Sequence, residues 1–240
     1  MKSSERHRLK ENELTHVLGD ARVRLDENRR TLGLVAAVVV AVLALGGGYW
    51  AWKTRTENRA QAMLADAIVV VQSPIAEEKP GSKPAVGTFA NVRARSEASL
   101  AKFTEAFNAY PSTEAGIAAR YYAAAALAML GRHGEAATRY KEVVDRAGSD
   151  SFYGRMARLG VIDANTQAKQ YDEAISAAQA LVNAAGDEVM PRDALLMELG
   201  RVQAAAGKKA EAKQTLDKVI AEFPESPYVE EAKRMLTELT

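Results

Sequence analysis

The chain has 240 residues, of which 48% are hydrophobic and 26% charged, enough for one or two domains. Its 32 Lys and Arg residues balance 31 Asp and Glu residues, so the chain lacks the basic excess typical of nucleic-acid-binding proteins. Cysteine is absent, which excludes disulfides, thiolate metal sites and a cysteine nucleophile. Alanine, the residue with the highest helix propensity, occurs 46 times, and this composition predicts an all-α fold.

Residues 31–52 contain no charged side chain and predict a transmembrane helix. A helix of these 22 residues would be about 33 Å long, which is sufficient to cross the hydrocarbon core of a bilayer. The alternative is a cleaved signal peptide, but such a peptide has a shorter apolar core and a short basic tail, whereas 30 residues precede this segment. We therefore expect a retained membrane span.

Basic residues on the two sides of this span predict its orientation. Eight Lys and Arg residues precede it and three follow it closely, which favours an N-terminus in the cytoplasm. Residues 53–240 would then lie outside the cytoplasm; the inverted orientation is the alternative. Amphipathic aromatic rings at the far end of the span would settle among the lipid headgroups. The residues expected at the two membrane interfaces are Arg29, Arg30, Tyr49, Trp50, Trp52 and Lys53.

Three segments outside the span have distinct compositions. Residues 1–30 mix both charge signs, which favours a solvated cytoplasmic tail with a short interfacial helix; a docking segment for a cytoplasmic partner is the alternative. Residues 54–72 have apolar side chains at helical spacing and predict an amphipathic helix. Residues 73–88 gather three prolines and two glycines among few large apolar side chains, which predicts a loop.

The rest of the chain repeats with a period of 38 residues. Segments 131–144, 169–182 and 207–220 align without gaps, and each has a Glu-Ala pair at the same position. Apolar or aromatic residues follow each of these alanines at four and seven positions, so they lie on one face of a helix. The alanines are Ala136, Ala174 and Ala212. We expect helices at 91–109, 112–130, 134–147, 151–168, 171–185, 191–206, 209–223 and 226–239.

This pattern resembles the tetratricopeptide repeat, in which a small residue begins the second helix of a pair and a bulky residue follows four positions later. The preceding helices place Ala124, Ile162 and Gly200 where that family has a small residue facing the next helix. Leu199 and Gly200 match its Leu-Gly signature, although the period of 38 exceeds the family's usual value of about 34. The resemblance implies an α-solenoid of about four helix pairs, the first interrupted by the 73–88 loop, with the last helix as a cap.

A single span followed by such a domain resembles, in its layout, the membrane-anchored ancillary subunit of the bacterial Sec translocon. That resemblance implies a scaffold in the bacterial inner membrane whose periplasmic repeats bind translocon subunits or periplasmic chaperones. A scaffold that coordinates cell-wall or outer-membrane assembly is the alternative, because both would share this fold. Neither nucleic acid nor a small-molecule substrate is expected as a ligand.

An enzyme is the least expected class of protein. The three histidines, His7, His16 and His133, have no second histidine four residues away, so the helical zinc-binding arrangement is missing. The sequence also lacks a G-x-S-x-G nucleophile elbow and a phosphate-binding glycine-rich loop. We therefore expect no catalytic residue, no metal site and no cofactor.

The surface left for binding is the concave side of the solenoid, which the first helix of each pair lines in repeats of this type. Polar tips such as those of Tyr121, Asp163 and Arg201 are the strongest candidates, because they must face water or a partner. Methionines at these positions suit an adaptable groove, but Met156 and Met197 are equally explained as packing between repeats. The full set of candidate groove residues is Tyr121, Met129, Met156, Asp163, Gln167, Met197 and Arg201.

Overall fold

The computed structural model of the chain describes residues 29–76, 86–184 and 191–240. Within these residues the chain forms nine α-helices, and its β-type pairing is an isolated bridge between Ile75 and Phe89. The all-α prediction is therefore confirmed. The chain divides into one unit that ends at Arg55 and a second that comprises Thr56–Thr240. Most of the predicted N-terminal tail and of the predicted 73–88 loop lies outside the described residues.

Helix α2 runs from Arg29 to Gln72, so the predicted span and the predicted helix 54–72 are parts of one helix. The three glycines at 46–48 do not interrupt it, because a glycine costs a helix only about 1 kcal/mol relative to alanine. The apolar side chains of its first part are exposed, as Leu45 shows with 75% of its surface accessible. Among the described helices, α2 is the one long and apolar enough to cross a membrane, a criterion that a signal sequence also meets.

The residues expected at the membrane interfaces all belong to α2. Arg29 is its first residue, and Arg30 lies exposed beside it. At the other end, the side chains of Tyr49, Trp50 and Trp52 are each more than 60% exposed, and the rings of Tyr49 and Trp52 are 6.0 Å apart. Lys53 is also exposed. The assignment of these residues to headgroup regions stays a prediction.

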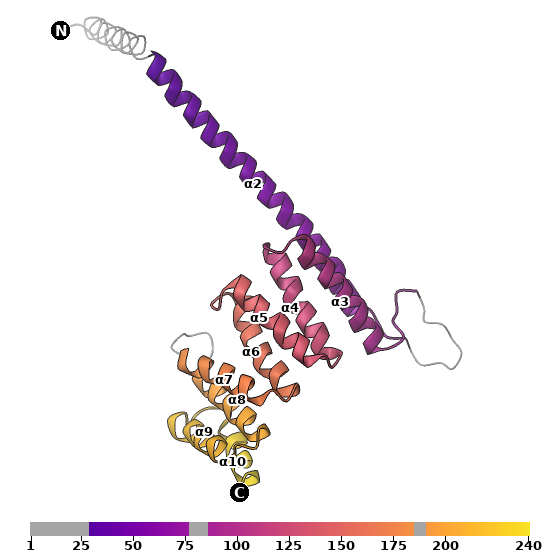
Figure 1. The fold of residues 1–240 in the computed structure, drawn as a ribbon, viewed down its shortest axis with the longest axis vertical. Helices are drawn as coiled ribbons and strands as arrows, with labels where there is room; N and C mark the ends of the chain where they lie inside the picture. Colours follow the sequence, from indigo (N-terminus) through magenta and orange to yellow (C-terminus); the bar gives the residue numbers. More distant parts are fainter. Residues whose placement is uncertain (1–28, 77–85, 185–190) are drawn as a thin grey trace, which may run out of the picture. The chain divides into compact units, whose positions relative to one another are not determined.

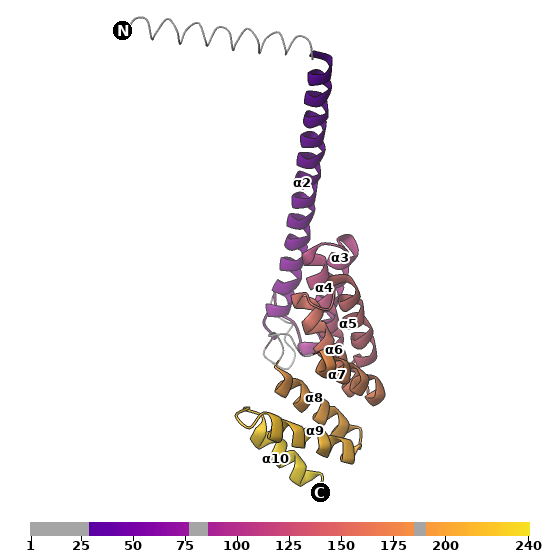
Figure 2. The same ribbon diagram turned by 90° about the vertical axis from the view of Figure 1, so that its left-hand side faces the viewer.

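The second unit continues as a series of short helices in which each contacts the next, and Figures 1 and 2 show them as a stack. Each of these helices begins and ends within three residues of its predicted bounds. An apolar or small residue every three to four positions explains this agreement, because it sets the buried face of each helix. The helices are α3 (Val92–Ala109), α4 (Glu114–Met129), α5 (His133–Ala147), α6 (Phe152–Gln167), α7 (Tyr171–Ala184), α8 (Arg192–Ala205), α9 (Lys209–Glu222) and α10 (Val229–Glu238).

The turn inside each helix pair has the same geometry at intervals of 38 residues. Gly131, Lys169 and Gly207 have φ angles of 74°, 60° and 74°. One residue later, the backbone N–H donates to a carbonyl five residues back, with N···O distances of 2.9, 2.8 and 2.9 Å. Lys169 therefore adopts a left-handed conformation that glycine occupies in the other two turns.

The turns between pairs also recur. Thr113 and Ser151 cap α4 and α6, and each hydroxyl accepts a 3.0 Å hydrogen bond from a glycine N–H three residues later. These glycines, Gly116 and Gly154, leave no space for a side chain: a Cβ would lie 1.7 and 1.9 Å from a carbonyl oxygen of the preceding turn. Thus the 38-residue interval fixes both the turn within a pair and the turn that leads to the next pair.

Small residues allow the helices to pack closely. The three alanines of the Glu-Ala pairs, at 136, 174 and 212, have no accessible surface, and Ala124 is also fully buried. A Cβ on Gly200 would lie 2.8 Å from a methyl carbon of Leu216, so the two helices of that pair are in near contact. The larger Ile162 at the equivalent position of the middle pair is accommodated in the core, with 1% of its surface exposed.

Candidate functional site

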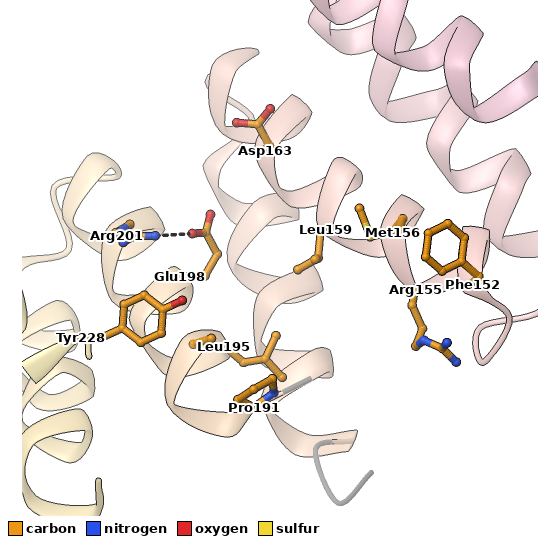
Figure 3. Close-up of a pocket in the computed structure, with 11 residues that line it drawn as sticks. Phe152, Arg155, Met156, Leu159, Asp163, Pro191, Leu195, Glu198, Arg201 and Tyr228 are labelled. Atoms are coloured by element: carbon orange, nitrogen blue, oxygen red, sulfur yellow. Dashed lines mark hydrogen bonds and ion pairs between the residues drawn. The ribbon is translucent and has the colours of Figure 1, made fainter. Parts of the chain in front are cut away.

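A groove of about 590 Å³ lies between α6, α8 and the start of α10, and we call it the main groove (Figure 3). Figure 3 shows Phe152 and Met156 on one side of it and Tyr228 with Arg201 on the other. The first helices of two successive pairs and the capping helix therefore form its walls. The described residues that line it are Phe152, Arg155, Met156, Leu159, Asp163, Pro191, Ala194, Leu195, Glu198, Arg201 and Tyr228.

The main groove has mostly apolar walls and a few charged side chains. Phe152 is 63% exposed and Met156 39% exposed, although both are large apolar residues. The lining also holds two carboxylates, Asp163 and Glu198, and two guanidinium groups, so its formal charge is balanced. A concave, mainly apolar surface with a few fixed polar groups is typical of sites that bind peptide side chains or other ligands.

Arg201 has ion-pair partners within the protein. Its Nη2 donates to both carboxylate oxygens of Glu231, at 2.8 Å each, and its Nη1 donates to Glu198 at 3.1 Å. These bonds connect α8 with α10 and fix the guanidinium on one wall of the groove. The expectation that its polar tip faces water or a partner is therefore incomplete, because two glutamates satisfy much of its hydrogen-bonding capacity.

The structure separates the two methionines that the sequence could not distinguish. Met156 lines the main groove, whereas Met197 has no accessible surface and belongs to the hydrophobic core. The placement of Met197 on the binding surface is thus wrong. It packs between repeats because its helical phase matches that of Leu159 in the preceding pair.

The remaining candidates lie outside the main groove. Met129, 66% exposed, and the exposed Gln167 are the last residues of α4 and α6. Tyr121 is half-buried in a cluster of tyrosine rings, and its ring centroid lies 5.4 Å from that of Tyr140 and 5.6 Å from that of Tyr153. Burial raises the pKa of Tyr121, and Tyr122 raises it further, so this hydroxyl is neutral at physiological pH.

A second groove of about 490 Å³ lies between α2, α4 and α6, and we call it the acidic groove. Phe152 lines both grooves. Sequence analysis did not single out Phe152, Leu195 or Tyr228, although the exposed aromatic at the start of α6 has a recognisable position directly after the helix cap Ser151. The described residues of the acidic groove are Glu57, Gln61, Leu64, Glu114, Ala115, Ile117, Ala118, Ala147, Ser151, Phe152 and Tyr153.

The side chains that line the two grooves offer apolar contact, hydrogen bonding and ion pairing to a partner. Throughout the described part of the chain, His, Cys, Asp and Glu side chains form no group of three or more that could hold a metal ion. The geometry of the grooves therefore points to recognition of another molecule through these contacts.

Residues 165–236 match the family model of the tetratricopeptide repeat. The stacked helix pairs form a tetratricopeptide-like solenoid. Repeats of this family act as protein-binding scaffolds, and their fold is typically not catalytic. The second half of that match contains α8, α9 and most of α10, so it includes one wall of the main groove.

Solved structures share this fold. The nearly identical TPR-like repeats of a presumed kinesin light chain from Podosopora anserina superpose with a TM-score of 0.55 at 17% sequence identity, covering 76% of this chain and 86% of that chain. A point variant of the same protein gives a TM-score of 0.55 and 17% identity as well, with 76% and 85% covered. At this identity the likeness concerns the fold. No curated protein matches the sequence.

Proposed function

We propose that this protein is a membrane-tethered scaffold whose repeats bind other proteins outside the cytoplasm. The main groove carries this proposal: it is concave, mainly apolar, and lined by two large apolar side chains that remain accessible, Phe152 and Met156. Exposed apolar side chains in a concave surface favour burial against a partner, at about 25 cal/mol for each Å² removed from water.

Support for the tether comes from the N-terminal part of α2. The apolar side chains there are exposed, and an 18-residue window of this helix has a mean hydropathy of 2.1. Such a surface is stable in lipid and unfavourable in water. The excess of basic residues before the span favours a cytoplasmic N-terminus and extracytoplasmic repeats, which in a bacterium would lie in the periplasm.

For the partner, we favour the protein-translocation channel or its periplasmic chaperones, on the basis of the single span followed by repeats. Factors of cell-wall or outer-membrane assembly are the alternative. The two are separated by replacing Met156 with a photo-crosslinking amino acid in the full chain, in native membranes, and identifying the products by mass spectrometry. The exposed Lys218, on α9 and outside both grooves, is the matched control position.

Translocon subunits recovered from position 156 and missing from position 218 would support the favoured partner. Wall or outer-membrane factors with the same position dependence would support the alternative. Identical products from both positions, or none from position 156, would contradict a role for the main groove. A compartment-dependent reporter fused to the C-terminus tests the orientation, and activity only in the cytoplasm would contradict it.

A further inference from the structure

The acidic groove has a charge pattern that differs from that of the main groove. Among its described lining residues, Glu57 and Glu114 carry negative charge and none carries positive charge. The other lining residues are apolar, aromatic or uncharged polar. A partner group that fills this groove would therefore meet two carboxylates beside an apolar wall.

Glu57 is held in a fixed position by the start of α4. Its Oε1 accepts from the backbone N–H of Ala115 at 3.0 Å, and its Oε2 accepts from that of Glu114 at 3.2 Å. The N-terminal end of a helix is equivalent to about half a positive charge, so α4 offsets only part of the charge of the two carboxylates. The groove keeps a negative potential that a cation would complement.

The apolar wall of the groove is partly aromatic. Leu64 and Ile117 come from α2 and α4, and Phe152 and Tyr153 from the start of α6. The rings of Phe152 and Tyr153 are 5.2 Å apart with their planes at 80°. Burial raises the pKa of Tyr153, with Tyr122 and the carboxylate of Glu114 as further causes, which places that carboxylate near the tyrosine hydroxyl.

We propose that the acidic groove binds a Lys or Arg side chain of the partner protein. The aliphatic stem of such a side chain would pack on Leu64, Ile117 and Phe152, and its cationic end would lie between the carboxylates of Glu57 and Glu114. Because Phe152 also lines the main groove, the partner segment would carry apolar side chains beside this basic residue. This inference rests on the proposed function and specifies the chemistry of its partner.

The charged groups of the main groove set the direction of this segment. The Arg155 guanidinium donates to the backbone carbonyl of Asp150, next to the start of α6. Arg201 is paired with Glu198 and Glu231. A partner cation would be repelled by Arg155 and attracted by the acidic groove, so the basic residue should occupy the groove between α2, α4 and α6.

The experiment uses the full chain in lipid nanodiscs and a random peptide library displayed on phage. We expect enrichment of peptides that combine apolar residues with Lys or Arg over peptides with Asp or Glu. A selected peptide is then compared with a version in which norleucine replaces the basic residue, which keeps the aliphatic stem and removes the charge. By fluorescence anisotropy, the norleucine version should bind about three- to tenfold more weakly, and high salt should reduce this ratio.

Glu114→Gln is the first variant, because this exposed side chain caps no helix; Glu57→Gln follows, with thermal melting to verify its fold. Glu222→Gln, on the exposed surface of α9, is the matched control. The ratio between basic and norleucine peptides should approach one in the groove variants and stay unchanged in the control. Apolar peptides selected without basic residues would overturn this inference and leave the proposed function standing, whereas no selection of any peptide would count against both.

Discussion

Replacing Lys169 with glycine should stabilise the repeats. Lys169 has a φ of 60°, while Gly131 and Gly207 occupy the same turn position 38 residues before and after it. A left-handed conformation costs a non-glycine residue about 1–2 kcal/mol. Glycine adds freedom to the unfolded chain that costs about 0.5–1 kcal/mol, and removing a cation near the end of α6 costs about 0.3 kcal/mol.

The difference is a gain of about 0.5 kcal/mol or slightly more in the free energy of unfolding, or about 1–3 °C in melting temperature. It is measured by circular dichroism on the full chain in detergent, by heating and in urea. Gly207→Ala is the reverse control and should lose about 1 kcal/mol, because alanine at positive φ is strained. A lower melting temperature for Lys169→Gly would refute the claim that this turn is strained by its side chain.

Three further substitutions test packing and pH dependence by the same unfolding measurements. Ala174→Leu should cost about 1–3 kcal/mol, since Ala174 has no accessible surface, and an unchanged midpoint would show that the repeat phase is wrong. Gly154→Ala should cost about 3 kcal/mol, because its Cβ would lie 1.9 Å from a carbonyl oxygen, whereas Gly134→Ala, where nothing lies within 4 Å, should not destabilise. Burial raises the pKa of Tyr140 above its unfolded value of about 10, so its stabilising contribution is complete below that pH and declines above it; Tyr140→Phe should reduce this alkaline decline, and identical pH profiles would contradict it.

The fold was predictable because each level of the sequence indicates the same helices. The spacing of apolar residues sets the buried faces, and the 38-residue interval places Ala136, Ala174 and Ala212 at equivalent crossings where only small side chains fit. The strained turn at Lys169 was not predicted, because a lysine gives no local sign of a positive φ. It becomes visible only when the backbone is aligned with the glycines of the neighbouring repeats.

The binding surface was only partly predictable. Met156 and Met197 are the same residue type on equivalent helices, but Met156 shares its repeat position with two alanines, Ala118 and Ala194, and Met197 shares its position with Leu159. A position occupied by large side chains in successive repeats fills the core, whereas one occupied by alanine leaves room for a groove. The acidic groove had no such signal, since Glu57 reaches the start of α4 from a helix on the other side of the 73–88 loop.

One repeat position also explains why the main groove stays open between α6 and α8. Arg201 of α8 pairs with Glu231 of α10, and the residues 38 positions earlier are Asp163 and Asp193. Two carboxylates at these places repel each other, so the ion pair that joins α8 to α10 has no counterpart between α6 and α8. Asp193 instead accepts a hydrogen bond from Ser226 Oγ at 2.6 Å, which leaves Asp163 exposed at the edge of the groove. The period locates equivalent positions, and the sign of the charges at those positions decides which pair of helices is joined and which presents a binding surface.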